Sequence, residues 1–245
     1  MGLNRMVGLL TSIALLVAIP SRAGDKNVLF RDDFENLNNW KPFHFPKIKQ
    51  HSTYSIHTEE DISVLMAESS ASASALVYKD TFSVYEYPCA RWRWKVENVY
   101  RGGDARNKQG DDYSMRVYIV FQYEPAEAGF FAKVKNSAAK LFYGEYPPHS
   151  TLNYLWANKR HEESILTSSY TPKSKLIPLQ AGGEQTGTWC VERVNIVEDY
   201  VNAFGFKPPE RAGIAIMNDS DNTGEQSVSY LDYIEVYREM EINDS

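Results

Sequence analysis

The sequence predicts an all-β protein, a mainly antiparallel β-sandwich with one or two short helices. Short runs in which apolar and polar residues alternate recur along the chain, as the two-residue period of a strand requires. Polar breaks, often with glycine or proline, separate these runs, and their spacing is typical of a sandwich or barrel. The 245 residues fit one domain, because all-β sandwiches reach this length around a single core.

The first 23 residues have the pattern of a secretory signal peptide. Arg5 precedes an apolar run from Val7 to Ile19, which is short for a membrane span. Ser21-Arg22-Ala23 offers small residues at the two positions that a signal peptidase reads. We expect cleavage after Ala23, one domain over residues 24–245 without a membrane span, and a periplasmic or secreted protein. An uncleaved membrane anchor is the alternative.

The expected strands follow one another with short breaks. A segment with two prolines, Lys41–Gln50, is expected to be irregular. One short helix is expected around Val134–Phe142, and an amphipathic helix at Glu198–Phe204, which Gly205 ends. The expected strands are Val28–Glu35, Thr53–Thr58, Ile62–Glu68, Ala75–Phe82, Arg91–Glu97, Ser114–Tyr123, Thr151–Asn158, a pair within Ser164–Leu179, Thr188–Val194, Arg211–Asn218 and Ser227–Tyr237.

Two of these strands, Arg91–Glu97 and Ser114–Tyr123, organise the expected fold. Each has one apolar face for the core, which in the first strand carries Trp92 and Trp94. The opposite faces carry arginine, tyrosine and glutamine, and the Gly-rich loop between the strands is acidic. We expect the two polar faces to form the floor of one binding groove. The candidate ligand-binding residues are Arg93, Asp111, Asp112, Arg116, Tyr118, Asp219 and Asp221.

The acidic candidates allow more than one chemistry. Asp111, Asp112 and Arg116 could serve as acid, base and anion clamp, or they could form an ion-paired network that fixes the loop. The run Asp219-x-Asp221-x-Thr223-Gly224 has the alternating oxygens of a calcium loop, but it lacks the distant glutamate of an EF-hand. A turn held by its own side chains is the alternative. The calcium interpretation gains support if the folded chain brings Asp111 or Asp112 close to Asp219 and Asp221.

The overall charge argues against several classes of partner. Of 26 Lys and Arg residues, Arg5 and Arg22 leave with the leader, so 24 remain against 32 Asp and Glu. A general nucleic-acid or anionic-membrane binder usually carries a basic face, so we expect neither partner. The five histidines show no zinc spacing, and no GxSxG, phosphate-binding loop or dinucleotide fingerprint is present. These observations leave hydrolase-fold esterase, NTPase and Rossmann functions without support.

The chain has two cysteines, Cys89 and Cys190. An oxidising compartment would permit a disulfide between them, and two buried thiols are the alternative. Neither cysteine has a histidine nearby in the sequence, so a catalytic thiol has no support.

Several longer stretches together resemble one bacterial family. They are WRWKV followed by GDDYSMRVYIVF, then NYLW, then VEDYVNAFGFKPPERAGIAIMNDSDNT leading to YLDYIEV. In combination they resemble the exported family catalogued as domain of unknown function 3047, over most of the mature chain. The resemblance implies export and a single all-β domain. It transfers no catalytic residue, because the family carries no assigned activity.

A second, looser resemblance concerns architecture. The beginning DDFE, followed by Trp40, and the ending LDYIEV are similar to the first and last strands of jelly-roll carbohydrate-binding and lectin-like domains. In many such domains, acidic residues near the two ends bind a structural calcium, and here Asp33, Glu35 and Asp232 would match. Alternation places Asp232 on the same face as Ile234, so its carboxylate needs a partner, either calcium or an arginine or backbone amide.

The sequence therefore favours an exported, non-catalytic binding protein for a glycan or another polar small ligand. Trp156, Tyr118 and Tyr154 are candidates to stack on a sugar ring, whereas Trp92 and Trp94 are expected in the core. Two alternatives remain open. One is a polysaccharide-active enzyme that uses a pair of the aspartates, and the other is a structural partner in an envelope assembly.

Overall fold

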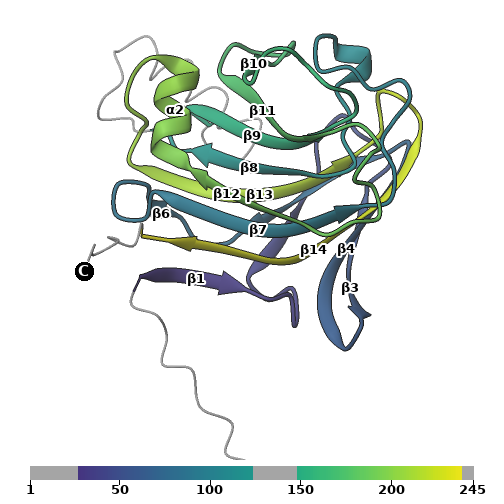
Figure 1. The fold of residues 1–245 in the computed structure, drawn as a ribbon, viewed down its shortest axis with the longest axis horizontal. Coiled ribbons are helices and arrows are strands. Elements are labelled where there is room, and N and C mark those ends of the chain that lie inside the picture. Colours follow the sequence, from purple (N-terminus) through teal and green to yellow (C-terminus); the bar gives the residue numbers. More distant parts are fainter. Residues whose placement is uncertain (1–26, 124–147, 239–245) are drawn as a thin grey trace, which may run out of the picture.

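The computed structural model describes residues 27–123 and 148–238, which form two β-sheets packed face to face (Figure 1). The leader over residues 1–23 and the helix expected around Val134–Phe142 lie outside the described residues. In the described part of the chain, no helix is long and apolar enough to cross a membrane. The all-β sandwich predicted from the sequence is confirmed.

The first sheet, sheet A, is antiparallel throughout. Its strands lie in the order β12-β7-β14-β4-β3, and β1 pairs with β14. The strands are β1 (Val28–Asp32), β3 (Thr53–Glu59), β4 (Ile62–Ser70), β7 (Cys89–Val96), β12 (Cys190–Asn195) and β14 (Gln226–Tyr237).

The second sheet, sheet B, has the order β10-β11-β9-β8-β13-β5-β2, and β6 pairs with β13. Its pairs are antiparallel apart from β9 with β11, which run parallel. The strands are β2 (Trp40–Phe43), β5 (Ala73–Tyr78), β6 (Phe82–Ser83), β8 (Arg116–Phe121), β9 (Ser150–Ala157), β10 (Leu166–Thr167), β11 (Ser174–Ala181) and β13 (Arg211–Asp219).

In the part of the chain that the structure describes, two short helices accompany the sheets, the 3-10 turn η1 (Lys108–Gly110) and α2 (Ile196–Phe204). The side chain of Asn195 accepts from two amides of the first turn of α2 and so caps it. Gly205 ends α2 in the left-handed conformation with φ 81°, as the sequence predicted. Figure 1 shows α2 at one end of the sandwich, where Tyr200 packs on Phe121 of β8.

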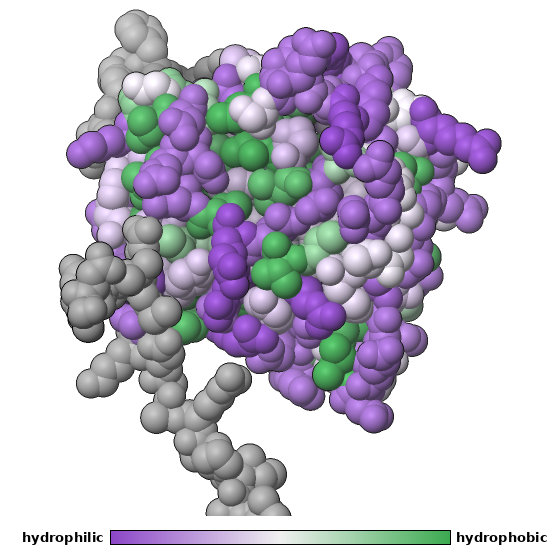
Figure 2. Space-filling model, in the orientation of Figure 1, coloured by the Kyte–Doolittle hydropathy of each residue, from purple (hydrophilic) through white to green (hydrophobic). Residues whose placement is uncertain are grey.

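The core lies between the sheets and is rich in tryptophan. Trp92 and Trp94 of β7 are fully buried, and their rings contact Tyr154 and Trp156 of β9 across the sandwich at centroid distances of 5.5 and 5.8 Å. The prediction that Trp92 and Trp94 belong to the core is confirmed. Trp156 and Tyr154 are equally buried, so the prediction that they stack on a sugar is wrong. On the face shown in Figure 2, hydrophilic residues predominate and apolar residues form small separate patches.

One expectation about strand pairing is also wrong. The strands β7 and β8 do not share a sheet: β7 pairs with β12 and β14, and β8 pairs with β9 and β13. Both strands turn their apolar side chains toward the shared core from opposite sheets, so Arg93 and Arg116 lie on the outward sides of different sheets. The reason is that alternation identifies the inward face of a strand but not its neighbour in the sheet.

The segment Lys41–Gln50, expected to be irregular, begins with a strand. Residues Trp40–Phe43 form β2, which among the described strands pairs with β5 alone, at the edge of sheet B. Pro42 is tolerated there because an edge strand has one side without ladder hydrogen bonds.

One end of the interior is polar. The fully buried Asn218 donates through Nδ2 to the Ala67 carbonyl and to Ser229 Oγ, both at 3.0 Å. Its Oδ1 accepts from Ser227 Oγ at 2.9 Å, and Ser227 in turn contacts the hydroxyl of Tyr100. These bonds satisfy groups that would otherwise be costly to bury, and they join β13, β14 and β4.

No disulfide joins the two cysteines. The β12–β7 ladder places Cys190 opposite Trp94 and Cys89 opposite Asn195. Five strand positions therefore separate the two sulfurs, about 16 Å along the ladder, and a disulfide needs Cα atoms within about 7 Å. Both cysteines are therefore thiols, but only Cys89 is buried as the second alternative expected, whereas Cys190 is partly exposed.

Candidate functional site

Most of the predicted ligand-binding residues gather at the end of sheet B where β8 begins and β13 ends. Arg116 forms an ion pair with Asp219 and lies 3.5 Å from Asp111. Its guanidinium lies between the rings of Tyr113 and Tyr118, 4.8 and 5.6 Å from their centroids. We call this group the Arg116 cluster. Its members are Asp111, Asp112, Arg116, Tyr118, Asp219 and Asp221.

Strand pairing and one close loop contact build this cluster. Arg116 stands beside Met217 in the β8–β13 ladder, and the amide of Asp219 donates to the Tyr113 carbonyl at 3.2 Å. The loop before β8 is held by Asn158, whose Nδ2 donates to the Asp112 carbonyl at 2.7 Å. Gly103 leaves the space for this side chain, because a Cβ there would lie 2.0 Å from the same nitrogen.

Most of the cluster is buried, and the cluster is rich in negative charge. Arg116 is 4% exposed and Asp219 is 1% exposed. Burial raises the pKa of Asp111, Asp219 and Asp221 above the usual carboxyl range, while the charge of Arg116 acts in the opposite direction. Four carboxylates therefore lie around one guanidinium, which pairs with two of them, Asp111 and Asp219.

Burial limits what this cluster can do chemically. A glycosidase holds two carboxylates on either side of an accessible sugar bond, but Asp111, Asp112 and Asp219 are shielded from solvent. The arrangement agrees with the alternative interpretation, an ion-paired network that fixes the loop before β8.

Arg93, the remaining predicted site residue, lies on the outer face of sheet A. There, cations of β1 and β7 lie over aromatic rings: Arg93 is 4.8 Å from the Trp189 ring centroid and Lys95 is 4.6 Å from that of Tyr230. These rings are partly exposed. We call this surface the aromatic–cation band, formed by Arg31, Arg91, Arg93, Lys95, Trp189, Tyr230, Tyr233 and Tyr237.

Carboxylates fix the cations of this band in place. Buried Glu235 accepts from Arg31 at 3.1 Å and forms an ion pair with Arg91 at 2.7 Å. Asp232 accepts from Arg93 at 2.9 Å, and Glu59 accepts from Lys95 at 2.6 Å. The guanidinium and ammonium groups therefore stand in defined positions beside the rings, and cation–π attraction adds to the ion pairs.

The acids suggested as calcium ligands by the jelly-roll resemblance are not gathered. A bulge between Leu231 and Tyr233 shifts the register of β14, so Asp232 faces Arg93 instead of sharing the core face of Ile234. Asp33 pairs with Arg31, and Glu35 is exposed.

Asp32, the first acidic residue of the DDFE segment, has a structural role instead. Buried Asp32 accepts from the amide of Phe34, from Trp40 Nε1 and from Asn39 Nδ2 at 2.9 to 3.1 Å. It therefore joins the end of β1 to the start of β2.

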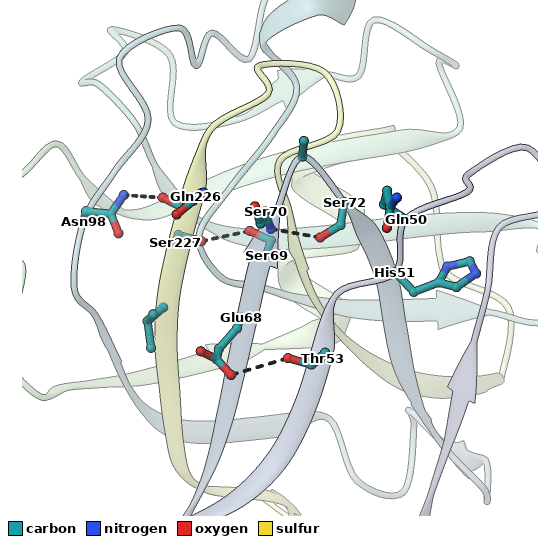
Figure 3. Close-up of a pocket in the computed structure, with 12 residues that line it drawn as sticks. Gln50, His51, Thr53, Glu68, Ser69, Ser70, Ser72, Asn98, Gln226 and Ser227 are labelled. Atoms are coloured by element: carbon teal, nitrogen blue, oxygen red, sulfur yellow. Dashed lines mark hydrogen bonds between the residues drawn. The ribbon is translucent and has the colours of Figure 1, made fainter.

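A polar pocket of about 880 Å³ opens at one end of sheet A, and Figure 3 shows the side chains around it. Asn98 donates to the Gln226 carbonyl at 2.9 Å, and Thr53 donates to Glu68 at 3.4 Å. The tight turn beside it holds Ala71 at a φ of 47°, a left-handed conformation unusual for alanine. The lining residues are Gln50, His51, Thr53, Glu68, Ser69, Ser70, Ala71, Ser72, Asn98, Gln226, Ser227 and Val228.

The pocket and the aromatic–cation band are connected along β14. Gln226 and Val228 line the pocket, and Tyr230, Tyr233 and Tyr237 follow on the same strand. The ladder pairs Tyr230 with Lys95 and Tyr233 with Arg93, so these rings share the outer face of sheet A. At about 3.3 Å per residue, the nine steps from Val228 to Tyr237 span roughly 30 Å.

Comparison with known families now identifies the chain, because one family matches residues 38–235. The protein belongs to the family described as "Protein of unknown function (DUF3047)". The resemblance seen in the sequence is thereby confirmed. No curated protein matches this DUF3047 chain.

Solved structures with a similar course of the chain include lectins and glycoside hydrolases. A tailspike protein 4 enzymatically active domain of bacteriophage CBA120 is 10% identical, with a TM-score of 0.38, and the match covers 82% of this chain but only 20% of that one. A winged bean acidic lectin is 9% identical over 86% of this chain and 98% of the lectin, with a TM-score of 0.37.

A thermostable cellulase derived from one of Rhodothermus marinus is 10% identical over 76% of this chain and 87% of that one, with a TM-score of 0.40. At this level of similarity, none of these proteins supplies an argument about the activity of this DUF3047 protein.

Sequence reasoning missed Trp189 and the pocket residues. Trp189 precedes β12, and its position beside Arg93 depends on β12 pairing with β7 at the edge of sheet A. The available signal was its context: Gly187 and Thr188 precede it, so it lacks the apolar alternation that surrounds Trp92 and Trp94.

Proposed function

We propose that this DUF3047 protein is a non-catalytic binding protein for a glycan or another polar small ligand, which lies along the outer face of sheet A. The observation that carries the proposal is the continuity of the aromatic–cation band with the polar pocket along β14. We further propose that the protein acts after export, in the periplasm or outside the cell, as its leader sequence predicts.

The band offers two kinds of contact that a sugar chain can use. Partly exposed rings, such as Trp189 and Tyr230, present flat apolar surfaces on which the C–H faces of sugar rings can stack. Trp and Tyr provide such area at little conformational cost, because each has two side-chain torsions. Arg93 is about one-third exposed at 33% and has donors beyond the nitrogen that bonds Asp232.

The pocket adds hydrogen-bonding capacity at the end of the band. Most of its lining side chains are neutral donors and acceptors, including Gln50, Thr53, Asn98 and Gln226. Sugars expose hydroxyl groups that match such a lining, and polar groups of this kind orient a ligand and give specificity.

The placement of carboxylates favours binding over catalysis. In the band, Glu235, Asp232 and Glu59 are each engaged with an arginine or lysine. Among the described residues that line the pocket, Glu68 is the one carboxylate. Hydrolysis of a glycosidic bond commonly uses two carboxylates.

The experiment is a binding screen of the purified protein with neutral and acidic oligosaccharides, followed by titration calorimetry of each hit. Trp189→Ala should weaken binding at least tenfold, equivalent to about 1.4 kcal/mol, with an unchanged circular dichroism spectrum. Phe206→Ala is the matched control, because Phe206 is an exposed aromatic residue beside α2. It should bind as wild type does.

Three outcomes would oppose the proposal. Saccharide binding that is unchanged in Trp189→Ala would show that the ligand does not bind on the aromatic–cation band. Release of shorter saccharides would favour the enzyme alternative. If no saccharide binds, and an envelope protein is captured in a way that depends on Trp189, the surface serves protein assembly instead.

A further inference from the structure

Three aspartates of the Arg116 cluster lie in the arrangement of a cation site. Asp112, Asp219 and Asp221 each place a carboxylate oxygen within 4.8 Å of the other two. They come from the loop before β8, from the end of β13 and from the loop that follows β13. Within residues 27–123 and 148–238, this is the one such group of acidic, histidine or cysteine side chains.

The carboxylate of Asp112 indicates that a ligand belongs there. Asp112 is 0% exposed. Its Oδ2 accepts from the amides of Asn222 and Thr223 at 3.0 and 2.6 Å. Its Oδ1 has no hydrogen-bond partner among the described residues. A buried carboxylate oxygen without a donor is unfavourable, and a cation among the three aspartates would satisfy it.

The charges within the Arg116 cluster also favour a bound cation. Arg116 is the cation in contact with the cluster, and it is engaged with Asp219 and Asp111. It forms no ion pair with Asp112 or Asp221 within the described part of the chain. The cluster therefore keeps an excess of negative charge in a site with little solvent, where a divalent ion would offset it.

From these observations we propose that Asp112, Asp219 and Asp221 bind a divalent cation, and that the cation is calcium. The three side chains supply oxygen only, which suits a hard cation rather than zinc or copper. Calcium takes six to eight oxygen ligands in flexible geometry, so backbone carbonyls and water can complete its shell. Magnesium requires a stricter octahedron and retains more of its water.

A cation here would fasten two loops that lie far apart in the sequence. Asp112 Oδ2 already accepts from two amides of the loop after β13. The sequence offered a hydrogen-bonded turn or a calcium loop for Asp219-x-Asp221, and a loop held in this way can be both. Ser220, between two of the ligands, donates its amide to the Ser72 carbonyl at 2.8 Å, and Ser72 lines the polar pocket. The ion would thus support one wall of that pocket.

The test is titration of the purified protein with Ca²⁺ after exhaustive dialysis against EDTA, read by calorimetry and by thermal unfolding. We expect saturable binding of one ion and a Tm that rises with Ca²⁺ above the Kd, because the ion binds the folded state. Titration with Mg²⁺ should give at least tenfold weaker binding.

Two variants and one control make the test specific. Asp221→Asn changes the partly exposed ligand, so it should fold and lose at least tenfold in Ca²⁺ affinity. Asp112→Asn should lose at least a hundredfold. Asp33→Asn is the control from the other end of the chain and should keep wild-type affinity. The proposal is overturned if chelated protein shows no saturable binding, or if Asp221→Asn binds like wild type, or if Asp33→Asn abolishes binding.

Discussion

Replacement of Arg116 by methionine tests whether the buried ion pairs hold the Arg116 cluster together. Methionine retains much of the length of the side chain between Tyr113 and Tyr118 but removes the guanidinium. Asp219, 1% exposed, and Asp111 then lose their cationic partner. Breaking a buried pair in this way costs about 3 to 5 kcal/mol, because an uncompensated charge stays buried.

The assay is differential scanning calorimetry in the presence of EDTA, so that no bound cation masks the effect. For a domain of this size, each kcal/mol lowers Tm by about 2 to 4 °C, so Arg116→Met should lower it by roughly 6 to 20 °C. Arg160→Met is the matched control, because Arg160 is 76% exposed in its pair with Glu184 and exposed pairs contribute little. If the two variants melted at the same temperature, the argument from burial would fail.

Two further substitutions test the polar interior and the electrostatics. Asn218→Ala removes the hydrogen bonds to Ala67 and Ser229 and should lower the free energy of unfolding by about 2 to 4 kcal/mol. In urea denaturation the midpoint should fall while the slope stays unchanged. An unchanged midpoint would show that the network contributes nothing to stability. Burial raises the pKa of Asp199, whose Oδ2 accepts from the Tyr154 hydroxyl at 2.8 Å, so stability from this group is lost as pH rises from its unfolded pKa through its folded pKa. Asp199→Asn should therefore gain stability relative to wild type as pH rises above about 4, the ordinary pKa of an aspartate, when both are compared by chemical denaturation; a pH-independent difference would contradict the assignment.

Much of the fold could be predicted because strand alternation is local. The expected strand Arg211–Asn218 matches β13, which ends one residue later, and Ser227–Tyr237 matches β14, which begins one residue earlier. Partners across the sheet are not local. Trp94 and Trp156 were each expected to lie in strands, but only the folded chain shows that they meet across the core.

The candidate site was predictable in part for the same reason. Asp112 lies in the loop that leads into β8 and Asp219 ends β13, and these two strands prove to be neighbours, so their convergence follows from the β8–β13 pairing. Arg93 could not be separated from Arg116 without knowing that β7 belongs to the other sheet. The role of Asp232 depends on a bulge in β14, and a shift of one residue reverses the face of a side chain.

The chain offers a direct measurement of where its ligand binds, because its five tryptophans differ in exposure. Trp40, Trp92, Trp94 and Trp156 are buried in the core, and Trp189 is partly exposed on the aromatic–cation band. Each indole N–H gives its own signal in an ¹⁵N NMR spectrum, and Trp189→Phe assigns the fifth. On addition of a saccharide that binds, the Trp189 signal should shift while the four core signals stay in place. A saccharide that binds without moving the Trp189 signal would contradict the proposed surface.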